Sequence, residues 1–347
     1  MFVIRNKFST EKAEQTMKQQ KYPHDGNRPF PLLRIEGREF QVLKQLSLLE
    51  RGRWLIRDAH PRPRGTLFTA IIVEDTPASR QLERTLYRLK TNVNGIPHLV
   101  MKGYHQNKKV WVITWQEGND LESYLREIYE GRLRRPSVWE SIRRIKSLAH
   151  SLKIVNDRCQ IIHADIKPPN LVLQSPGAIA LIDYGSSWQT ERTVCKVEGD
   201  GRLAAYSAPE LLFSNQSIDS RADQFSTAVV LYELLTLHLP YMELGGKAGL
   251  PPHRVDVEGK YVPPSGLIPQ NQRIPKSILT EMDFVVGKAL KLDADQRFGT
   301  AQEFCDALEA VWYRLKGCQD SIASGDAKPN LLEKAIKWFV TKFPRAA

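Results

Sequence analysis

The alternation of apolar and polar residues divides the chain into two unlike parts. Runs with a period of two, rich in β-branched and aromatic residues, predict five strands at residues 39–49, 54–60, 65–75, 98–105 and 109–116. One helical pattern, at residues 79–89, lies between the third and fourth runs. The first part of the chain is therefore expected to form a small β lobe with one helix.

After Asn119 the apolar residues recur at helical spacing. Four stretches predict helices, at residues 120–131, 137–158, 219–237 and 278–292. A strand-rich insert at residues 161–185 separates the second helix from the third. The pattern predicts an α+β fold with two lobes, and the cleft between two such lobes is where ligands tend to bind.

Three regions follow from changes in composition. Residues 1–38 mix charged residues, Gln and turn formers and are expected to be an N-terminal extension outside the main fold. The main domain is assigned to residues 39–315, with a small lobe at 39–116 and a large lobe at 117–315. Residues 316–347 are expected to hold a linker and an amphipathic C-terminal helix.

The predicted C-terminal helix is basic and has an apolar face. That face is formed by Leu332, Ile336, Phe339 and Phe343. Packing against the large lobe is the simpler interpretation of this face. A partner groove, or weak contact with an anionic surface, is the alternative.

Composition excludes several classes of protein. Hydrophobic residues at 41% and charged residues at 26% match ordinary globular proteins and argue against wholesale disorder. No run is long and apolar enough to span a bilayer, and the first residues lack the apolar stretch of a secretory signal, so a cytoplasmic protein is expected. The net charge of +11 favours acidic partners through steering, but a solvated basic surface explains it equally well, and no specific nucleic-acid site is expected.

The strongest chemical signal is the sequence HADIKPPN at residues 163–170, followed after a short hairpin by Asp183. Phosphoryl transfer needs a carboxylate that orients the attacking hydroxyl and accepts its proton, ligands for Mg²⁺ and a positive charge near the moving group. Asp165 is the candidate carboxylate and Lys167 the candidate positive charge. Asn170 and Asp183 are the candidate metal ligands.

These residues resemble the catalytic loop and metal-binding motif of protein kinases, and the resemblance covers residues 39–315. Glu210 ends an Ala-Pro-Glu motif like the one that closes the activation segment of kinases. Asp223 matches the buried aspartate that ties the next helix to the catalytic loop, and Arg297 matches the arginine that pairs with the glutamate. Lys167 resembles serine/threonine kinases more than tyrosine kinases.

The resemblance implies that the chain binds ATP and Mg²⁺ and acts on a protein substrate or signalling partner. The stretch at residues 111–120 resembles the kinase hinge, whose backbone groups bond the adenine edge. Thr114 and Gln116 are expected at this edge, and Asp120 near the ribose. Because backbone recognition tolerates sequence change, nucleotide binding could persist in a divergent member.

The nucleotide-binding lobe departs from the kinase pattern. The expected Gly-rich loop, residues 47–54, keeps Gly52 in the third position of its pattern, and Glu50 places negative charge near the phosphates. Ile72 stands at the expected place of the strand lysine that holds the phosphates. Its usual partner on the following helix, expected to be Glu83, would then lack an ion pair.

Several residues bear on whether the chemistry survives. Arg51, Arg53 or Arg57 could supply the missing cation, as happens in kinases without the strand lysine; solvated surface arginines are the alternative. Ala164 replaces an arginine that grips a phosphorylated activation loop, so switching of that kind is not expected. Leu203 replaces the threonine that contacts the catalytic Asp and Lys in similar kinases, which puts substrate recognition in doubt.

Three functions remain open from the sequence. The first is a serine/threonine protein kinase that transfers the γ-phosphoryl group of ATP. The second is a catalytically impaired pseudokinase that acts as a scaffold or an allosteric regulator in signalling. The third is an enzyme with a kinase fold that transfers another group or uses another acceptor.

Overall fold

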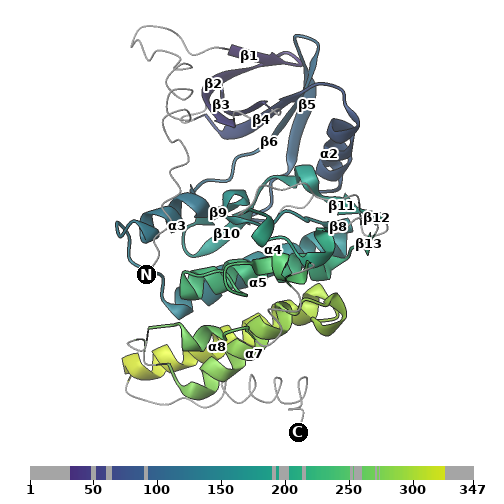
Figure 1. Ribbon diagram of the computed structural model, residues 1–347. Helices are drawn as coiled ribbons and strands as arrows, with labels where there is room; N and C mark the ends of the chain where they lie inside the picture. The colour runs from purple at the N-terminus through teal and green to yellow at the C-terminus, as the bar shows by residue number, and fades with distance from the viewer. Residues whose placement is uncertain are drawn as a thin grey trace.

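The computed structural model describes residues 32–47, 52–59, 65–89, 93–189, 193–194, 203–212, 216–250, 253, 260–269, 272 and 274–324. Its small lobe holds a six-stranded antiparallel sheet in the order β1-β2-β3-β4-β6-β5, with helix α2 beside it (Figure 1). The elements are β1 (Leu32–Ile35), β2 (Arg38–Ser47), β3 (Gly52–Asp58), β4 (Leu67–Val73), α2 (Pro77–Arg88), β5 (Leu99–His105) and β6 (Lys108–Thr114). The bilobal α+β fold expected from the sequence is confirmed.

Strand β1 lies within the stretch that was expected to fall outside the main fold. It pairs with β2 from Leu32↔Gln41 to Ile35↔Arg38, and Leu33 and Ile35 are buried. The expectation differs from the structure because a four-residue strand flanked by Pro and Gly gives a weak alternation signal. The small lobe therefore begins before residue 39.

The two faces of the sheet pack against different partners. On β4, Ile71 and Val73 join the large core that includes Leu82 and Leu86 of α2. The alternate residues of the same strand, among them Ile72, pack in a second core with buried residues of β1 and β2. Successive side chains of a strand point to opposite faces, so Ile71 lies on the α2 side and Ile72 on the other side.

The large lobe is helical, as its apolar spacing predicts (Figure 1). Its helices are α3 (Leu121–Tyr129), α4 (Val138–Cys159), α5 (Ser220–Thr236), α7 (Lys276–Ala289) and α8 (Ala301–Ser324). Helix α8 was not identified from the sequence. Helix α5 is the centre of the lobe, because nearly every residue along it is buried. Its buried residues include polar ones, and Asp223 and Glu233 are hydrogen-bonded to other parts of the lobe.

Side chains cap the helices at the expected places. Ser137 accepts the N–H of Glu140 and the Glu140 carboxylate accepts the N–H of Ser137, which forms a capping box at the start of α4. Thr76 and Ser79 form the same motif at the start of α2. Among the described residues, no helix is long and apolar enough to cross a membrane.

Short strands in the large lobe carry the candidate site. They are β7 (Asn119–Asp120), β8 (Ile161–Ile162), β9 (Leu171–Gln174), β10 (Ala178–Leu181) and β11 (Trp188–Gln189). The loop between β8 and β9 holds the HADIKPPN sequence, and the chain after β10 holds Asp183. Because β9 and β10 form a hairpin, the two motifs return to the same place beneath the small lobe.

Candidate active site

The candidate catalytic loop is fixed from below by α5. The Asp223 carboxylate accepts the backbone N–H of His163 at 2.8 Å and that of Ala164 at 2.9 Å. Ala164 has a φ of 60°, a left-handed conformation that is uncommon for a residue with a side chain. Burial raises the pKa of Asp223, although the His163 ring and the two N–H donors oppose the rise. The predicted tie between α5 and the loop is confirmed.

Asp165, Lys167 and Asn170 form one hydrogen-bonded group. Lys167 Nζ lies 2.8 Å from Asp165 Oδ1. Asn170 Nδ2 donates to Asp165 Oδ2 at 2.9 Å and to the Asp165 carbonyl oxygen at 2.8 Å. The Asp165 carboxylate is thus held from two sides, and about 17% of its side chain is exposed.

Asp183 lies in a strained turn directly after Ile182, whose backbone N–H donates to the Asn170 carbonyl oxygen at 2.9 Å. Its φ is 63° and its carboxylate accepts the N–H of Gly185 at 3.2 Å. The Arg53 guanidinium of β3 forms an ion pair with the same carboxylate. Burial alone would raise the pKa of Asp183, but the charge and hydrogen bond of Arg53, with the Gly185 N–H, lower the pKa below its usual value. Asp183 is therefore held as an anion.

An aromatic contact joins the two halves of the site. The buried rings of His163 and Tyr184 meet edge to face with centroids 4.8 Å apart. A His163 ring nitrogen, Nε2, lies 3.1 Å from the Ile182 carbonyl oxygen. Burial raises the pKa of Tyr184, so this phenol stays neutral. The contact fixes Asp183, which lies between Ile182 and Tyr184, relative to the catalytic loop.

The hinge passes from β6 to β7. Thr114 exchanges backbone and side-chain hydrogen bonds with His98, while residues 115–117 lie outside every strand pairing. Gln116 is held by side-chain bonds to Thr114 and Gln174. The Asp120 carboxylate caps α3 by accepting the N–H of Ser123 at 2.7 Å. Asp120 thus has a structural partner, and a role of the Thr114 and Gln116 backbone in binding adenine stays a prediction.

The small-lobe residues are placed differently from the sequence interpretation. Ile72 lies on the face of the sheet away from α2, and Ile71 lies on the α2 side. Gly52 pairs with Ile72, so the residue that faces Ile71 across the strands is Arg53. The β4 residue on the α2 side, where the strand lysine was expected, is therefore Ile71 and not Ile72. Glu50 and Arg51 fall outside the described residues, and so does the side chain of Leu203.

Glu83 is not an orphaned partner of a missing lysine. Its carboxylate lies 3.5 Å from Lys102 Nζ and 3.6 Å from Lys109 Nζ, on strands β5 and β6. The expectation that Glu83 lacks an ion pair is wrong, because the α2 face that carries it turns toward these two strands. Another α2 side chain contacts the large lobe: Gln81 Nε2 donates to the Ser187 carbonyl oxygen at 3.2 Å.

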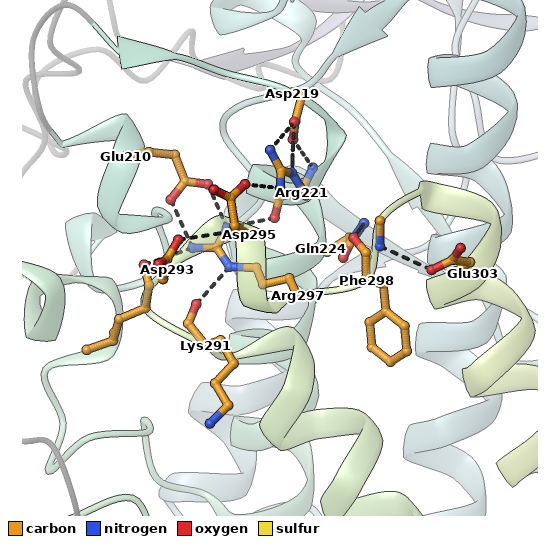
Figure 2. Close-up of polar contacts among 12 residues, drawn as sticks. Glu210, Asp219, Arg221, Gln224, Lys291, Asp293, Asp295, Arg297, Phe298 and Glu303 are labelled. Carbon is orange, nitrogen blue, oxygen red and sulfur yellow. Dashed lines mark hydrogen bonds and ion pairs between the residues drawn. The ribbon is translucent and has the colours of Figure 1, made fainter. Parts of the chain in front are cut away.

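The end of the activation segment is anchored by a buried ion pair (Figure 2). Arg297 donates to both Glu210 carboxylate oxygens, at 2.6 and 2.9 Å. Arg297 also donates to the carbonyl oxygens of Arg221 and Lys291 and lies over the Phe225 ring. The predicted pair is confirmed, and its bidentate geometry fixes the segment to the large lobe.

A cavity of about 760 Å³ opens beside the catalytic loop. Pro168 and Pro169 form part of its wall, and Pro168 follows Asp165 by three positions in the sequence. Its apolar lining includes Leu125 and Tyr206, and its rim carries both acidic and basic side chains. The cavity is large enough for side chains of a polypeptide.

The residues present fit Mg²⁺ and a nucleotide. Asn170 uses its amide nitrogen for both hydrogen bonds to Asp165, which leaves its amide oxygen as a ligand, and Asp183 is an anion. Within the described ranges, no group of three or more His, Cys, Asp or Glu could hold a metal. Mg²⁺ in such sites is bound by one or two protein oxygens together with substrate phosphates, so this donor set is suitable.

Chemistry of this kind at the junction of two lobes belongs to phosphotransferases that use a nucleoside triphosphate. Residues 88–312 match the protein kinase domain family, and the chain belongs to that family. The match begins at the last residue of α2. The strands that carry the altered phosphate-binding residues therefore lie outside it.

Several of the similar proteins are bacterial serine/threonine kinases. PknF of Mycobacterium tuberculosis is 29% identical over 244 residues, which cover 66% of this chain and 47% of the relative. PknB of Mycolicibacterium smegmatis is 30% identical over 165 residues, 44% of this chain and 25% of the relative. A probable serine/threonine-protein kinase PknB of Bifidobacterium longum is 31% identical over 150 residues, which cover 42% of this chain and 20% of the relative. The chain thus matches about half or less of the length of these relatives.

Proposed function

We propose that this protein transfers the γ-phosphoryl group of ATP to a serine or threonine hydroxyl of a protein substrate. The observation that carries the proposal is the bonded group of Asp165, Lys167 and Asn170, beside which the chain bonds through Ile182 and then presents the Asp183 carboxylate. A chain that had kept only the fold would have no physical need for a carboxylate paired with a lysine beside two oxygen ligands. The names of the similar bacterial kinases support the same acceptor class.

Each residue has a role that its contacts support. Asp165 is positioned to orient the acceptor hydroxyl and take its proton, while Lys167 supplies positive charge at the same place. Asn170 and Asp183 would hold Mg²⁺, which neutralises phosphate charge when bound. In the reaction the acceptor oxygen bonds to the γ-phosphorus, the bond from that phosphorus to the β–γ bridging oxygen breaks, and ADP leaves.

The cavity beside Pro168 and Pro169 is suited to the acceptor polypeptide. It continues from the catalytic loop to the end of the activation segment at Ala205 and Tyr206. An extended segment that places its hydroxyl at Asp165 would lay neighbouring side chains against this apolar lining. The rim holds charges of both signs, so shape and apolar contact select the segment more than net charge.

Replacement of the catalytic carboxylate tests the proposal. Asp165→Asn should lower phosphate transfer from labelled ATP to a mixture of Ser/Thr peptides by about a hundredfold or more, because a general base contributes that much. Asp157→Asn, an exposed aspartate on α4 of the same lobe, is the matched control and should keep wild-type activity. Equal transfer by both variants would contradict the assigned role.

A regulatory pseudokinase is the alternative, and one observation favours it. Within the described part of β4 no lysine is present, and Ile71 occupies the α2 side of the strand. Wild-type protein that binds ATP but transfers no phosphate to any Ser/Thr peptide would support this alternative and exclude the enzyme.

We also propose that the protein acts in the cytoplasm.

A further inference from the structure

The cation missing from β4 has a counterpart on the neighbouring strand. Arg53 of β3 is directly opposite Ile71 of β4 in the antiparallel pairing. Residues directly opposite one another project from the same face of a sheet. Ile71 packs against α2, so Arg53 projects from the side of the sheet that faces α2 and the cleft.

The contacts of Arg53 show that it reaches the site. Its guanidinium forms an ion pair with Asp183, a residue 130 positions later in the large lobe. The side chain of Arg53 is 19% exposed and that of Asp183 is 26% exposed. A solvated surface arginine would be far more exposed, and a partly buried pair is screened much less by salt than a surface pair.

Other described cations near the cleft have different partners. Lys167 pairs with Asp165, and Lys102 and Lys109 lie beside Glu83 on strands β5 and β6. Arg57, another residue of β3, is exposed. Among the described cations, Arg53 is the one that extends from the small-lobe sheet to a proposed Mg²⁺ ligand.

We propose that Arg53 binds the phosphates of the nucleotide and takes the place of the strand lysine that β4 lacks. The inference rests on the proposed function in that it takes a nucleoside triphosphate as the ligand. A guanidinium is suited to this role because its planar donors bind two phosphate oxygens at once and it stays charged at all working pH values. In the structure the same donors neutralise Asp183, the carboxylate beside which the phosphates would lie.

The first test compares two ligands that differ in phosphate. Calorimetric titration measures the Kd of ATP, with and without Mg²⁺, and the Kd of adenosine for wild type, Arg53→Gln and Arg53→Lys. Arg53→Gln should weaken ATP binding by at least about tenfold and leave adenosine binding unchanged, because a charge-assisted bond to phosphate is lost. Arg53→Lys should fall between wild type and Arg53→Gln.

The second test moves the cation to the facing strand. Arg53→Gln with Ile71→Lys should recover part of the ATP affinity, because position 71 projects from the same face as position 53. Arg53→Gln with Ile72→Lys is the matched control and should recover none, since Ile72 packs on the opposite face. Thermal unfolding of each variant identifies any loss of folding, and the single Arg53 variants remain informative if Ile71→Lys does not fold.

The results separate this inference from the proposed function. Equal ATP affinity in wild type and Arg53→Gln, or wild-type protein that binds ATP no more tightly than adenosine, would overturn the role of Arg53. Tight, Arg53-dependent ATP binding without phosphate transfer would support the role of Arg53 and overturn only the enzyme. An ATP affinity that rises in Arg53→Gln would show that Arg53 blocks Asp183 and would also overturn the inference.

Discussion

The ion pair between Arg297 and Glu210 has almost no contact with water. The Arg297 side chain is fully buried, and three further carbonyl groups accept its remaining N–H bonds. Removing one partner from such a pair leaves the other charge uncompensated in a medium of low dielectric constant. This pair is therefore a fixed point on which the end of the activation segment depends.

Replacement of Arg297 by methionine should destabilise the protein by about 3–5 kcal/mol, because the Glu210 carboxylate would then be buried without a partner. Urea unfolding measures the loss. Arg80→Met is the control of the same residue type: its pair with Asp75 is exposed on both sides, and little change is expected. A similar loss of unfolding free energy in the two variants would mean that the burial of the ion pair does not determine how much its removal destabilises the protein.

Two contacts of single residues were predicted correctly from the sequence. The tie of Asp223 to the catalytic loop and the Arg297–Glu210 pair were expected from motifs whose spacing is set by a loop or a helix, and both are present. The position assigned to Ile72 was one residue from the strand position that faces α2, because residues 67–73 carry apolar side chains on both faces of the strand. Without a clear alternation, the sequence does not show which residues share a face, and a shift of one residue exchanges the two faces.

At the scale of elements, the loop after α5 supports the activation segment. Tyr241, Met242 and Glu243 are three consecutive non-glycine residues with positive φ, at 57°, 55° and 69°. Such conformations cost about 1–2 kcal/mol per residue and persist only where contacts enforce them. Here the Tyr241 hydroxyl donates to the Leu290 carbonyl oxygen at 2.6 Å, and the Glu243 carboxylate accepts the Leu239 N–H at 3.0 Å.

This turn leads into glycines that lie against the activation segment. A Cβ at Gly246 would lie 1.7 Å from the Ser207 carbonyl oxygen, too close for any real contact. Gly246→Ala should therefore displace residues 203–209, destabilise the protein by about 2 kcal/mol or more and lower transfer to a Ser/Thr peptide. Unfolding by urea and a transfer assay with labelled ATP measure the two effects.

Gly266→Ala is the control for the glycine variant. Its added Cβ would meet Val262 at 3.5 Å, an ordinary contact, and its backbone needs no left-handed conformation. Little change in stability or transfer is expected. If Gly246→Ala behaves like this control, the glycine loop does not support the segment.

Elements differed in how well the sequence predicted them. The five expected strands of the small lobe, its helix and the four helices expected between residues 120 and 292 were found. The expected C-terminal helix with Leu332, Ile336, Phe339 and Phe343 lies outside the described residues. Strand β1 and helix α8 were not expected. The four residues of β1 are too few to establish a pattern, and a short strand gains its stability from Leu33 and Ile35 packing in the sheet rather than from local preference.

At the scale of the whole molecule, the site is shared between the lobes. Arg53 comes from the small lobe, and Asp165, Asn170 and Asp183 come from the large one. A ligand bound between the lobes stabilises the folded chain by mass action, by about 2.7 kcal/mol at a concentration of one hundred times Kd. The increase in melting temperature on adding ligand therefore measures binding by residues of both lobes together.

Substitution of Asp183 should separate the effect of Mg²⁺ on stability from the effect of the nucleotide. For wild type, Mg²⁺ added to ATP should raise the melting temperature beyond the effect of ATP alone, because Asp183 would hold the ion. Asp183→Asn should lose this Mg²⁺-dependent increment and keep the effect of metal-free ATP, since Arg53 is then free to bind phosphate. Differential scanning calorimetry measures the melting temperature of each protein with ATP alone and with ATP and Mg²⁺. If Mg²⁺ still raises the melting temperature of Asp183→Asn beyond the effect of ATP alone, Asp183 is not the Mg²⁺ ligand.

The Arg53–Asp183 ion pair has a kinetic consequence for the molecule. It joins the two lobes across the cleft, so a nucleotide enters only after the two charged groups separate. Association should then be slower than diffusion allows, and it should be faster in Asp183→Asn, in which this ion pair is absent. The arginine proposed to bind phosphate would in this way also control how fast nucleotide binds, because its ion pair with Asp183 must break before nucleotide enters.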